Sequence, residues 1–113
     1  MNRWPDPDLA ALDDDPRVAW TEDVIRFGDT DQNGHVNNAT FAVFCESGRV
    51  AMIRDRLRGE REGGGYFVVA SLRIDFRGEL FYPGRVRVGT WLSAMGRSSL
   101  TFGQVLLDDR GAC

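Results

Sequence analysis

Residues 24–49, VIRFGDTDQNGHVNNATFAVFCESGR, decide the fold, because they lead from a strand-like segment through a polar loop into a long helix. The segment that enters them, residues 18–27 (VAWTEDVIRF), is rich in β-branched and aromatic side chains, which is typical of a strand. Beyond the loop, Asn37 or Asn38 is a good N-cap, and no proline interrupts the expected helix. Apolar residues on two opposite sides of that helix predict that other parts of the fold surround it. One side carries Phe41, Cys45, Gly48 and Met52, and the other carries Ala39, Ala42, Val43, Val50 and Ile53.

The residues after the helix predict an antiparallel sheet. A glycine-rich run at 59–65 (GEREGGG) ends the helix, and apolar and polar side chains then alternate over 67–77, the pattern of a half-solvated strand. Further strands are expected at 85–94 and 100–109, and residues 108–113 predict a turn toward another strand. The expected class is α+β, with a curled antiparallel sheet wrapped around a long central helix and a second subunit covering the rest.

Length, charge and cysteine content exclude several classes of protein. At 113 residues the chain is one domain, and its 14 basic residues are scattered and outnumbered by 17 acidic ones, which argues against a nucleic-acid binder. No apolar run approaches the ~20 residues that span a bilayer, so no membrane partner is expected. The N-terminus lacks the apolar core of a secretion signal, and two cysteines are too few for a disulfide framework, so we expect a cytoplasmic protein. The acidic residues 1–17 are expected to form a solvated leader and residues 18–113 the domain.

The loop also matches part of a calcium-binding EF-hand loop. Asp29, Asp31 and Asn33 take its first, third and fifth positions, and Gly34 takes its sixth. The twelfth position needs a bidentate carboxylate but is Thr40, and the preceding segment predicts a strand where an EF-hand has a helix. We therefore expect no calcium binding.

The same loop places a carboxylate just ahead of a helix N-terminus. Free backbone N–H groups and the helix dipole create a positive field there, which suits a developing oxyanion. A carboxylate beside that field can attack an activated carbonyl, or deprotonate a water molecule that does so. A thioester suits this arrangement, because its thiolate departs without strong protonation.

Residues 24–49 resemble the hotdog-fold acyl-CoA thioesterases of the 4-hydroxybenzoyl-CoA thioesterase type, whose motif is V-R-F-x-D-T-D-x-x-G-H-V-N-N-x-x-Y/F-x-x-F-x-E-x-x-R. The later strands resemble the family's layout more weakly. The resemblance implies a curled antiparallel sheet around a central helix and an acyl-CoA or acyl-carrier-protein thioester as substrate. It also implies a homodimer or homotetramer with active sites between subunits, and no metal or other cofactor.

The resemblance assigns roles to four residues near the loop. Asp31 matches the catalytic aspartate, as nucleophile or general base, and the backbone N–H near Asn38 matches the amide that polarises the thioester carbonyl. Asn33 and His35 match an Asn-x-His pair that plant-type acyl-carrier-protein thioesterases place in the same loop. Each has a structural alternative: Asp31 can cap the turn, His35 can be a structural hydrogen-bonding group, and the asparagine can cap the helix.

Other candidate residues lie outside the loop. Glu46 matches a helix glutamate that some branches use catalytically, although an ion pair with Arg49 is an ordinary alternative. Arg97 and Ser98 lie in the turn GRSS, where relatives place basic residues for coenzyme A phosphates. Ser71, on the polar face of the expected strand at 67–77, is a further candidate for substrate contact, with solvated surface as its alternative.

The C-terminal residues depart from the family's pattern. Relatives usually continue for one more long strand after a turn like RGAC, residues 110–113, so the domain is expected to lack its final strand. Either the reading frame is short or neighbouring subunits cover the exposed edge. The first hypothesis is therefore an acyl-CoA thioesterase, and the alternative is a non-catalytic hotdog module that binds acyl thioesters or a protein partner.

Overall fold

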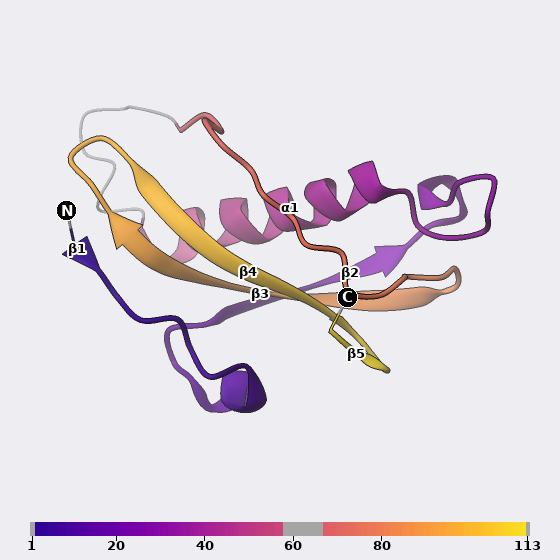
Figure 1. Ribbon diagram of the computed structural model, residues 1–113, viewed down its shortest axis with the longest axis horizontal. Coiled ribbons are helices and arrows are strands. Elements are labelled where there is room, and N and C mark those ends of the chain that lie inside the picture. Colours follow the sequence, from indigo (N-terminus) through magenta and orange to yellow (C-terminus); the bar gives the residue numbers. More distant parts are fainter. Residues whose placement is uncertain (1, 58–66, 113) are drawn as a thin grey trace.

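The computed structural model describes residues 2–57 and 67–112, and it places one long helix across an antiparallel sheet (Figure 1). Strand β3 lies at the centre, pairs with β1 and β2 along one edge and with β4 along the other, and β5 follows β4. The elements in chain order are β1 (Asn2–Arg3), the 3-10 helix η1 (Leu9–Asp14), β2 (Ala19–Ile25), the 3-10 helix η2 (Phe27–Asp29), α1 (Asn38–Arg56), β3 (Gly84–Met95), β4 (Leu100–Asp108) and β5 (Gly111–Ala112).

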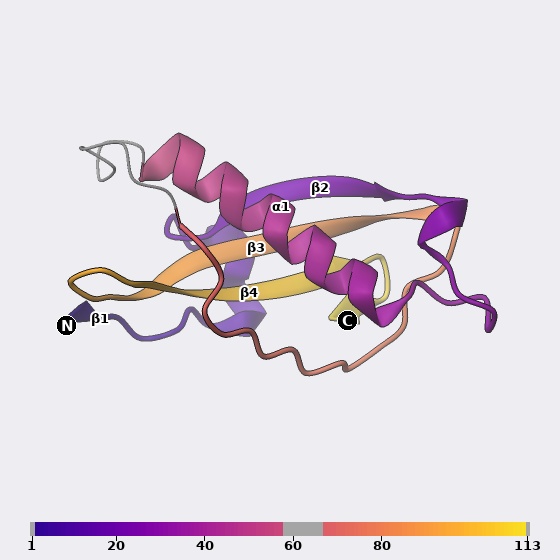
Figure 2. The ribbon, with the colours of Figure 1, turned by 90° about the horizontal axis from the view of Figure 1, so that it is seen from above.

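Helix α1 begins where the sequence predicts and lies over one face of the sheet (Figure 2). Of the two apolar sides that were expected to be covered, the side with Phe41 and Cys45 is buried, and these two residues share a core cluster with Val86 and Val88 of β3. The opposite side is open: Val43 and Val50 are 55% and 56% exposed. Its cover by a second subunit stays a prediction. The buried helix residues are Phe41, Phe44, Cys45, Gly48 and Met52.

Gly48 allows the helix to approach the sheet closely. A Cβ atom at this position would lie 2.8 Å from Thr90 Oγ1 and 3.0 Å from Gln104 Nε2. Gln104 cannot easily move away, because its Nε2 donates to the Cys45 carbonyl at 2.8 Å and to Thr90 Oγ1 at 2.9 Å. This partly buried polar network fixes how the middle of α1 sits on β3 and β4.

The acidic N-terminal segment covers the other face of the sheet. Leu12 and Val18 are buried with Trp91 in a second hydrophobic cluster, and the Trp91 indole donates to Asp6 at 3.0 Å. The expectation of a solvated leader is wrong in this respect, because apolar burial anchors the segment although most of its side chains are exposed. Its boundary with the domain at residue 18 stays a prediction.

The strand predicted at 67–77 does not form, and this prediction is wrong. The segment passes instead as an extended chain beside α1 (Figure 2). Alternation of apolar and polar residues is not sufficient for a strand, which also needs a neighbour to complete its hydrogen-bond ladder. No strand among the described residues pairs with this segment, and apolar side chains such as Val68, at 78%, stay exposed. The predicted helix end at 59–65 lies outside the described residues.

Strands form where the other strands were predicted, with small differences in their bounds. Strand β2 is shorter than the predicted 18–27, β3 and β4 match the predicted 85–94 and 100–109, and the C-terminal turn leads into the two-residue β5. The arrangement of a curled antiparallel sheet with one long central helix is therefore the predicted one.

Candidate active site

A short loop between β2 and α1 carries the aspartate and the histidine. Thr30 and Val36 pair as an isolated antiparallel bridge, and Gly34 reverses the chain between them with a φ of 81°. Glycine suits that position because residues with a side chain rarely adopt a positive φ. Asp29 is structural, since its carboxylate accepts the N–H of Arg26 at 2.8 Å. The shape of the loop thus follows from residues within or next to it.

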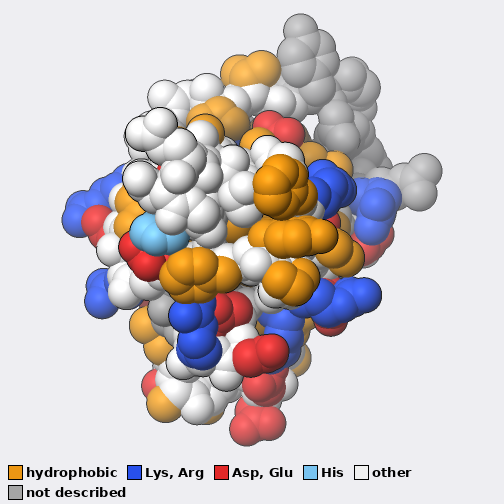
Figure 3. Space-filling model, turned by 90° about the vertical axis from the view of Figure 1, so that its right-hand side faces the viewer, with side chains coloured by type: hydrophobic (Ala, Val, Ile, Leu, Met, Phe, Trp, Pro, Cys, Tyr) orange, Lys and Arg blue, Asp and Glu red, His pale blue; other side chains and the backbone are white. Residues whose placement is uncertain are grey.

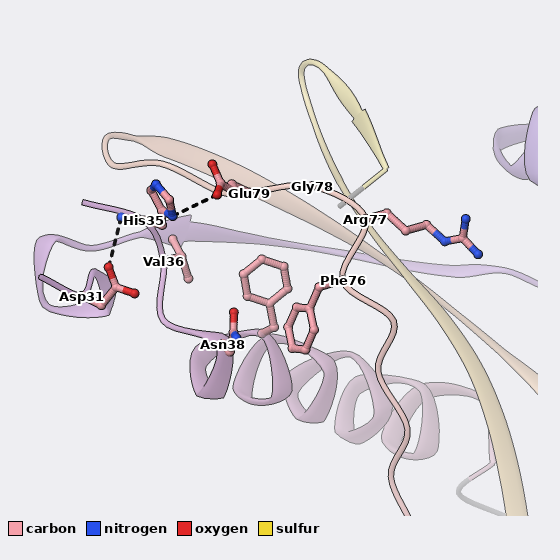
Figure 4. Close-up of a pocket in the computed structure, with 9 residues that line it drawn as sticks. Asp31, His35, Val36, Asn38, Phe76, Arg77, Gly78 and Glu79 are labelled. Carbon is pink, nitrogen blue, oxygen red and sulfur yellow. Dashed lines mark hydrogen bonds and ion pairs between the residues drawn. The ribbon is translucent and has the colours of Figure 1, made fainter. Parts of the chain in front are cut away.

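Asp31 has one carboxylate oxygen committed to the turn. Its Oδ1 accepts the backbone N–H of Asn33 at 2.8 Å and, at the longer distance of 3.4 Å, that of His35. Its Oδ2 has no hydrogen-bond partner within the described ranges 2–57 and 67–112. Figure 4 shows this second oxygen on the side of the loop nearer to Asn38. Asp31 therefore caps the turn and still offers one oxygen to a ligand.

The start of α1 presents a backbone donor close to this loop. Asn37 caps the helix, because its Oδ1 accepts the N–H of Ala39 at 2.9 Å, and its carbonyl accepts that of Thr40 at 2.8 Å. The N–H of Asn38 finds no acceptor in the part of the chain that the structure describes. The helix dipole is positive here, so this N–H suits a carbonyl oxygen that gains negative charge.

Both groups line a pocket of about 350 Å³ between the loop, the first turn of α1 and the extended segment (Figure 4). We call residues 31–41 its helical wall and residues 76–80 its extended wall. The lining residues are Asp31, His35, Val36, Asn38 and Phe41 of the helical wall, and Phe76, Arg77, Gly78 and Glu79 of the extended wall.

The two walls touch through backbone and side chains. The Val36 N–H donates to the Leu80 carbonyl at 2.8 Å, and His35 and Phe81 form an isolated antiparallel bridge. The His35 Nδ1 atom lies 3.1 Å from Glu79 Oε1. The extended wall is therefore fixed to the loop at its C-terminal end.

Two aromatic side chains line the pocket, and a second aromatic pair lies outside its lining. Phe41 and Phe76 of the lining meet edge to face with ring centroids 5.2 Å apart, and Phe27 meets Tyr82 in the same way at 5.7 Å. Figure 3 shows the chain's one histidine beside a group of hydrophobic side chains, with arginines and carboxylates around them. This end of the molecule therefore has an apolar surface with charged groups at its border.

The structure brings together three of the predicted site residues, namely Asp31, His35 and Asn38. Asn33 is exposed at the loop tip and does not line the pocket. Glu46 is exposed on α1, also outside the pocket lining. Its ion pair with Arg49, the structural alternative, is not among those formed by the described residues, and Arg49 donates to Gln104 Oε1 at 3.0 Å.

The three candidates for coenzyme A lie elsewhere on the chain. Arg97 and Ser98 are exposed in the turn between β3 and β4, at the opposite end of the long axis from the start of α1 (Figure 1). Ser71 is exposed on the segment that passes beside α1. None of them lines the pocket within one chain, and their part in substrate binding stays a prediction.

The sequence does not single out Glu79 or Phe76 as site residues. Phe76 belongs to the apolar face of the predicted strand, which gives no sign of a pocket. Glu79 is a single carboxylate between that strand and a turn, and nothing in its neighbourhood distinguishes it from an ordinary surface residue. Only the fold, which brings residue 79 to residue 35, reveals the contact.

Cys45 is not a candidate nucleophile. Burial raises the pKa of its thiol, and the nearby Arg49 guanidinium offsets that effect only in part. A neutral buried thiol is a packing group, as its place on the apolar side of the helix predicts.

The fold is that of the hotdog class, in which an antiparallel sheet curls around a long central helix. The sequence profile of the thioesterase-like superfamily matches residues 25–113. This chain belongs to that superfamily.

Individual relatives agree with the family. YsmA of Bacillus subtilis, an uncharacterized protein, is 31% identical over 77 residues, which are 68% of this chain and 52% of YsmA. The chain thus spans about half the length of this relative. YneP of the same organism, a candidate acyl-CoA thioesterase, is 29% identical over 83% of this chain and 70% of its own. A thioesterase of Thermus thermophilus, solved in complex with coenzyme A and zinc, superposes with a TM-score of 0.72 at 30% identity and covers 82% of this chain and 69% of its own.

The described residues form neither a metal cluster nor a membrane span. Within residues 2–57 and 67–112, no three His, Cys, Asp or Glu side chains gather closely enough to hold a metal ion. No helix in those ranges has both the length and the apolar composition that a membrane span requires.

Proposed function

We propose that this protein hydrolyses an acyl-CoA thioester to the free acid and coenzyme A. The observation that carries the proposal is that Asp31, with one unpaired carboxylate oxygen, and Asn38, with an unpaired N–H, line the same pocket among the described residues. A carboxylate and a donor for the oxyanion suffice for hydrolysis of a thioester, because the thiolate leaves without strong protonation. Membership of the thioesterase-like superfamily supports this chemistry.

Asp31 would act in one of two ways. As general base, Asp31 takes a proton from water, and the resulting hydroxide adds to the carbonyl carbon. The oxyanion that forms accepts a hydrogen bond from the Asn38 N–H. Collapse of this tetrahedral intermediate then breaks the C–S bond, and the leaving thiolate takes up the proton that Asp31 holds. As nucleophile, Asp31 instead displaces the thiolate directly to form an anhydride, which water then hydrolyses.

The sharpest test is the Asp31→Asn substitution. The new amide would keep an oxygen that accepts the Asn33 N–H, so the turn should persist, while the negative charge is lost. We expect this variant to lose about 100-fold or more of its turnover, the usual scale of a lost acid–base group, with an unchanged melting temperature. Release of thiol from a panel of acyl-CoA substrates measures this, and Asp14→Asn, at an exposed carboxylate of η1, is the matched control. Turnover close to wild type would refute the role of Asp31.

A non-catalytic module that binds acyl thioesters or a protein partner is the second candidate function. It is favoured by the two backbone N–H groups that Asp31 already accepts, because turn capping alone explains this residue. Thermal stabilisation by an acyl-CoA without thiol release would support this function, and stabilisation with release would support the first.

We also propose that the protein acts as a homodimer or homotetramer. The open side of α1, with Val43 and Val50, and the extended segment with Val68 and Leu72 leave apolar surface that a second copy would cover. Replacing Val43 and Val50 together by Glu should weaken self-association in sedimentation velocity, whereas Val24→Glu, at an exposed site on β2, should not. A wild-type protein that sediments as a monomer at all concentrations would contradict this proposal.

A further inference from the structure

The imidazole of His35 is held from two sides by residues of the extended segment. Its Nδ1 lies 3.1 Å from Glu79 Oε1, and its ring meets the Phe81 ring edge to face at 5.3 Å. The other ring nitrogen, Nε2, has no partner among residues 2–57 and 67–112, and it lies on the far side of the ring from Glu79 (Figure 4). His35, which lines the pocket, therefore has one nitrogen beside Glu79 and one nitrogen without a partner among the described residues.

The contact differs from an ordinary surface ion pair. The side chains are partly exposed, 34% for His35 and 56% for Glu79, and an isolated pair with that exposure contributes little to stability. Here both backbones are already fixed, because the Val36 N–H donates to the Leu80 carbonyl at 2.8 Å. The two side chains therefore lose little additional conformational freedom when they meet.

Arg110 fixes the Glu79 side of the contact from a third element. It lies in the turn between β4 and β5, its Nη2 donates to the Glu79 carbonyl at 2.7 Å, and its guanidinium stacks over the Phe81 ring at 4.8 Å. Asp108 forms an ion pair with Arg110, and its Oδ2 lies 2.8 Å from the same Nη2 atom. The residues that surround His35 are thus anchored in the sheet.

We infer that Glu79 is a positioning residue that keeps the His35 proton on Nδ1 and leaves Nε2 as the hydrogen-bond acceptor of the imidazole. A carboxylate can only accept from a neutral imidazole, so the nitrogen that faces it must be the protonated one, and the other nitrogen then carries the lone pair. Without Glu79 the imidazole is free to exchange its proton between the two nitrogens and to turn.

The direct test reads the tautomer of His35, which is the only histidine of the chain. In untagged, 15N-labelled protein at an alkaline pH, where the imidazole is neutral, its two nitrogens give one unambiguous pair of NMR signals. We expect protonated Nδ1 in the wild type and a loss of that preference in Glu79→Ala. Glu79→Gln, whose amide oxygen can still accept, should keep it. Glu22→Ala is the control, since Glu22 pairs with Arg85 at 2.7 Å at a similar exposure.

A proton on Nε2 in the wild type, or the same tautomer in Glu79→Ala, would overturn the inference. This test needs no enzymatic activity, so it stands even if no thioester is hydrolysed. Conversely, an unchanged tautomer together with an inactive Asp31→Asn variant would refute the inference and leave the proposed function intact.

A kinetic test rests on the proposed function and separates positioning from general damage. Glu79→Ala should lower kcat about tenfold, as losses of an orienting partner of histidine commonly do, with KM nearly unchanged. His35→Gln should lower it by more, and the double variant should be no worse than His35→Gln alone, because Glu79 acts only through His35. If the losses of kcat multiply in the double variant, Glu79 acts independently of His35. If Glu22→Ala loses as much kcat as Glu79→Ala, the loss reflects general damage and the positioning role is refuted.

Discussion

The two walls of the pocket are built in different ways. The helical wall, residues 31–41, is held by hydrogen bonds between residues that are near in sequence, such as Asn33 to Asp31 and Ala39 to Asn37. The extended wall, residues 76–80, forms no strand and is held by contacts with His35, Val36 and Arg110, all distant in sequence. The conformation of the helical wall therefore depends on local contacts, and that of the extended wall depends on contacts with residues distant in sequence.

Because of this difference, we expect substitutions in the helical wall to change the stability of the fold and substitutions in the extended wall to change the geometry of the pocket. Damage to the helical wall should alter the fold itself, because the wall is continuous with α1 and its core contacts. Loss of the exposed side chains at 76–79 should leave the fold and change the pocket, because Leu80 is the one residue of the extended wall that is buried in the core.

The largest effect is expected where the helix that continues the helical wall meets the sheet. A Gly48→Val side chain would collide with Thr90 and Gln104, which are held by a partly buried hydrogen bond to each other. Overpacking of this kind costs about 3 kcal/mol of the free energy of unfolding. Chemical denaturation measures it, and Gly28→Val, where a Cβ meets nothing within 4 Å, should change it by less than about 0.5 kcal/mol. Equal stability of the two variants would show that α1 can lift away from the sheet.

A smaller effect is expected at the helix start within the same wall. Asn37→Ala removes the side-chain oxygen that accepts the Ala39 N–H, and the loss of such a cap costs about 1 kcal/mol. Asn37→Asp keeps an acceptor and adds a charge that suits the helix dipole, so it should retain stability. Thermal and chemical denaturation of both variants distinguish them. An unaffected Asn37→Ala protein would mean that the helix start needs no cap.

The smallest effect on stability is expected from the anchor of the extended wall. Burial alone would raise the pKa of Asp108, but hydrogen bonds from the Arg110 side chain and backbone outweigh it, and the pKa lies below its ordinary value of 3.8. A lowered folded-state pKa stabilises the protein above the unfolded value and ceases to do so as the pH falls through the folded one. Asp108→Asn should therefore cost less than about 1 kcal/mol near neutral pH, on the scale of exposed ion pairs.

The pH dependence checks this assignment. The difference in the free energy of unfolding between wild type and Asp108→Asn should shrink as the pH falls below the unfolded value of 3.8. The adjacent Asp109→Asn is the control, because this carboxylate is exposed and the Arg110 guanidinium pairs with Asp108 instead. A difference that is independent of pH would show that Asp108 acts through shape and not through charge.

The sequence predicts the helical wall and fails on the extended one. Strand β2, the cap at Asn37 and the loop with Asp31 follow from residues a few positions apart, so their signals are visible in the chain itself. The alternation at 67–77 is equally clear, yet a strand needs a partner, and no local pattern reports whether a partner exists.

The same reasoning explains the other two failures. The acidic composition of residues 1–17 hides Leu12, whose burial depends on Trp91 far along the chain. Glu79 gives no signal because its significance comes only from the distance to His35 in the folded protein. Contacts between distant residues are what composition and periodicity do not encode.

The second hydrophobic cluster gives the molecule a built-in optical reporter. All three tryptophans lie on or beside the part of the sheet that the N-terminal segment covers: Trp91 within the cluster, Trp20 against it, and Trp4 bonded through its backbone N–H to the Ser93 carbonyl. None of them lines the pocket. Intrinsic fluorescence should therefore follow detachment of residues 1–17, while circular dichroism follows α1, and the two signals together can show whether the faces of the sheet unfold as one unit.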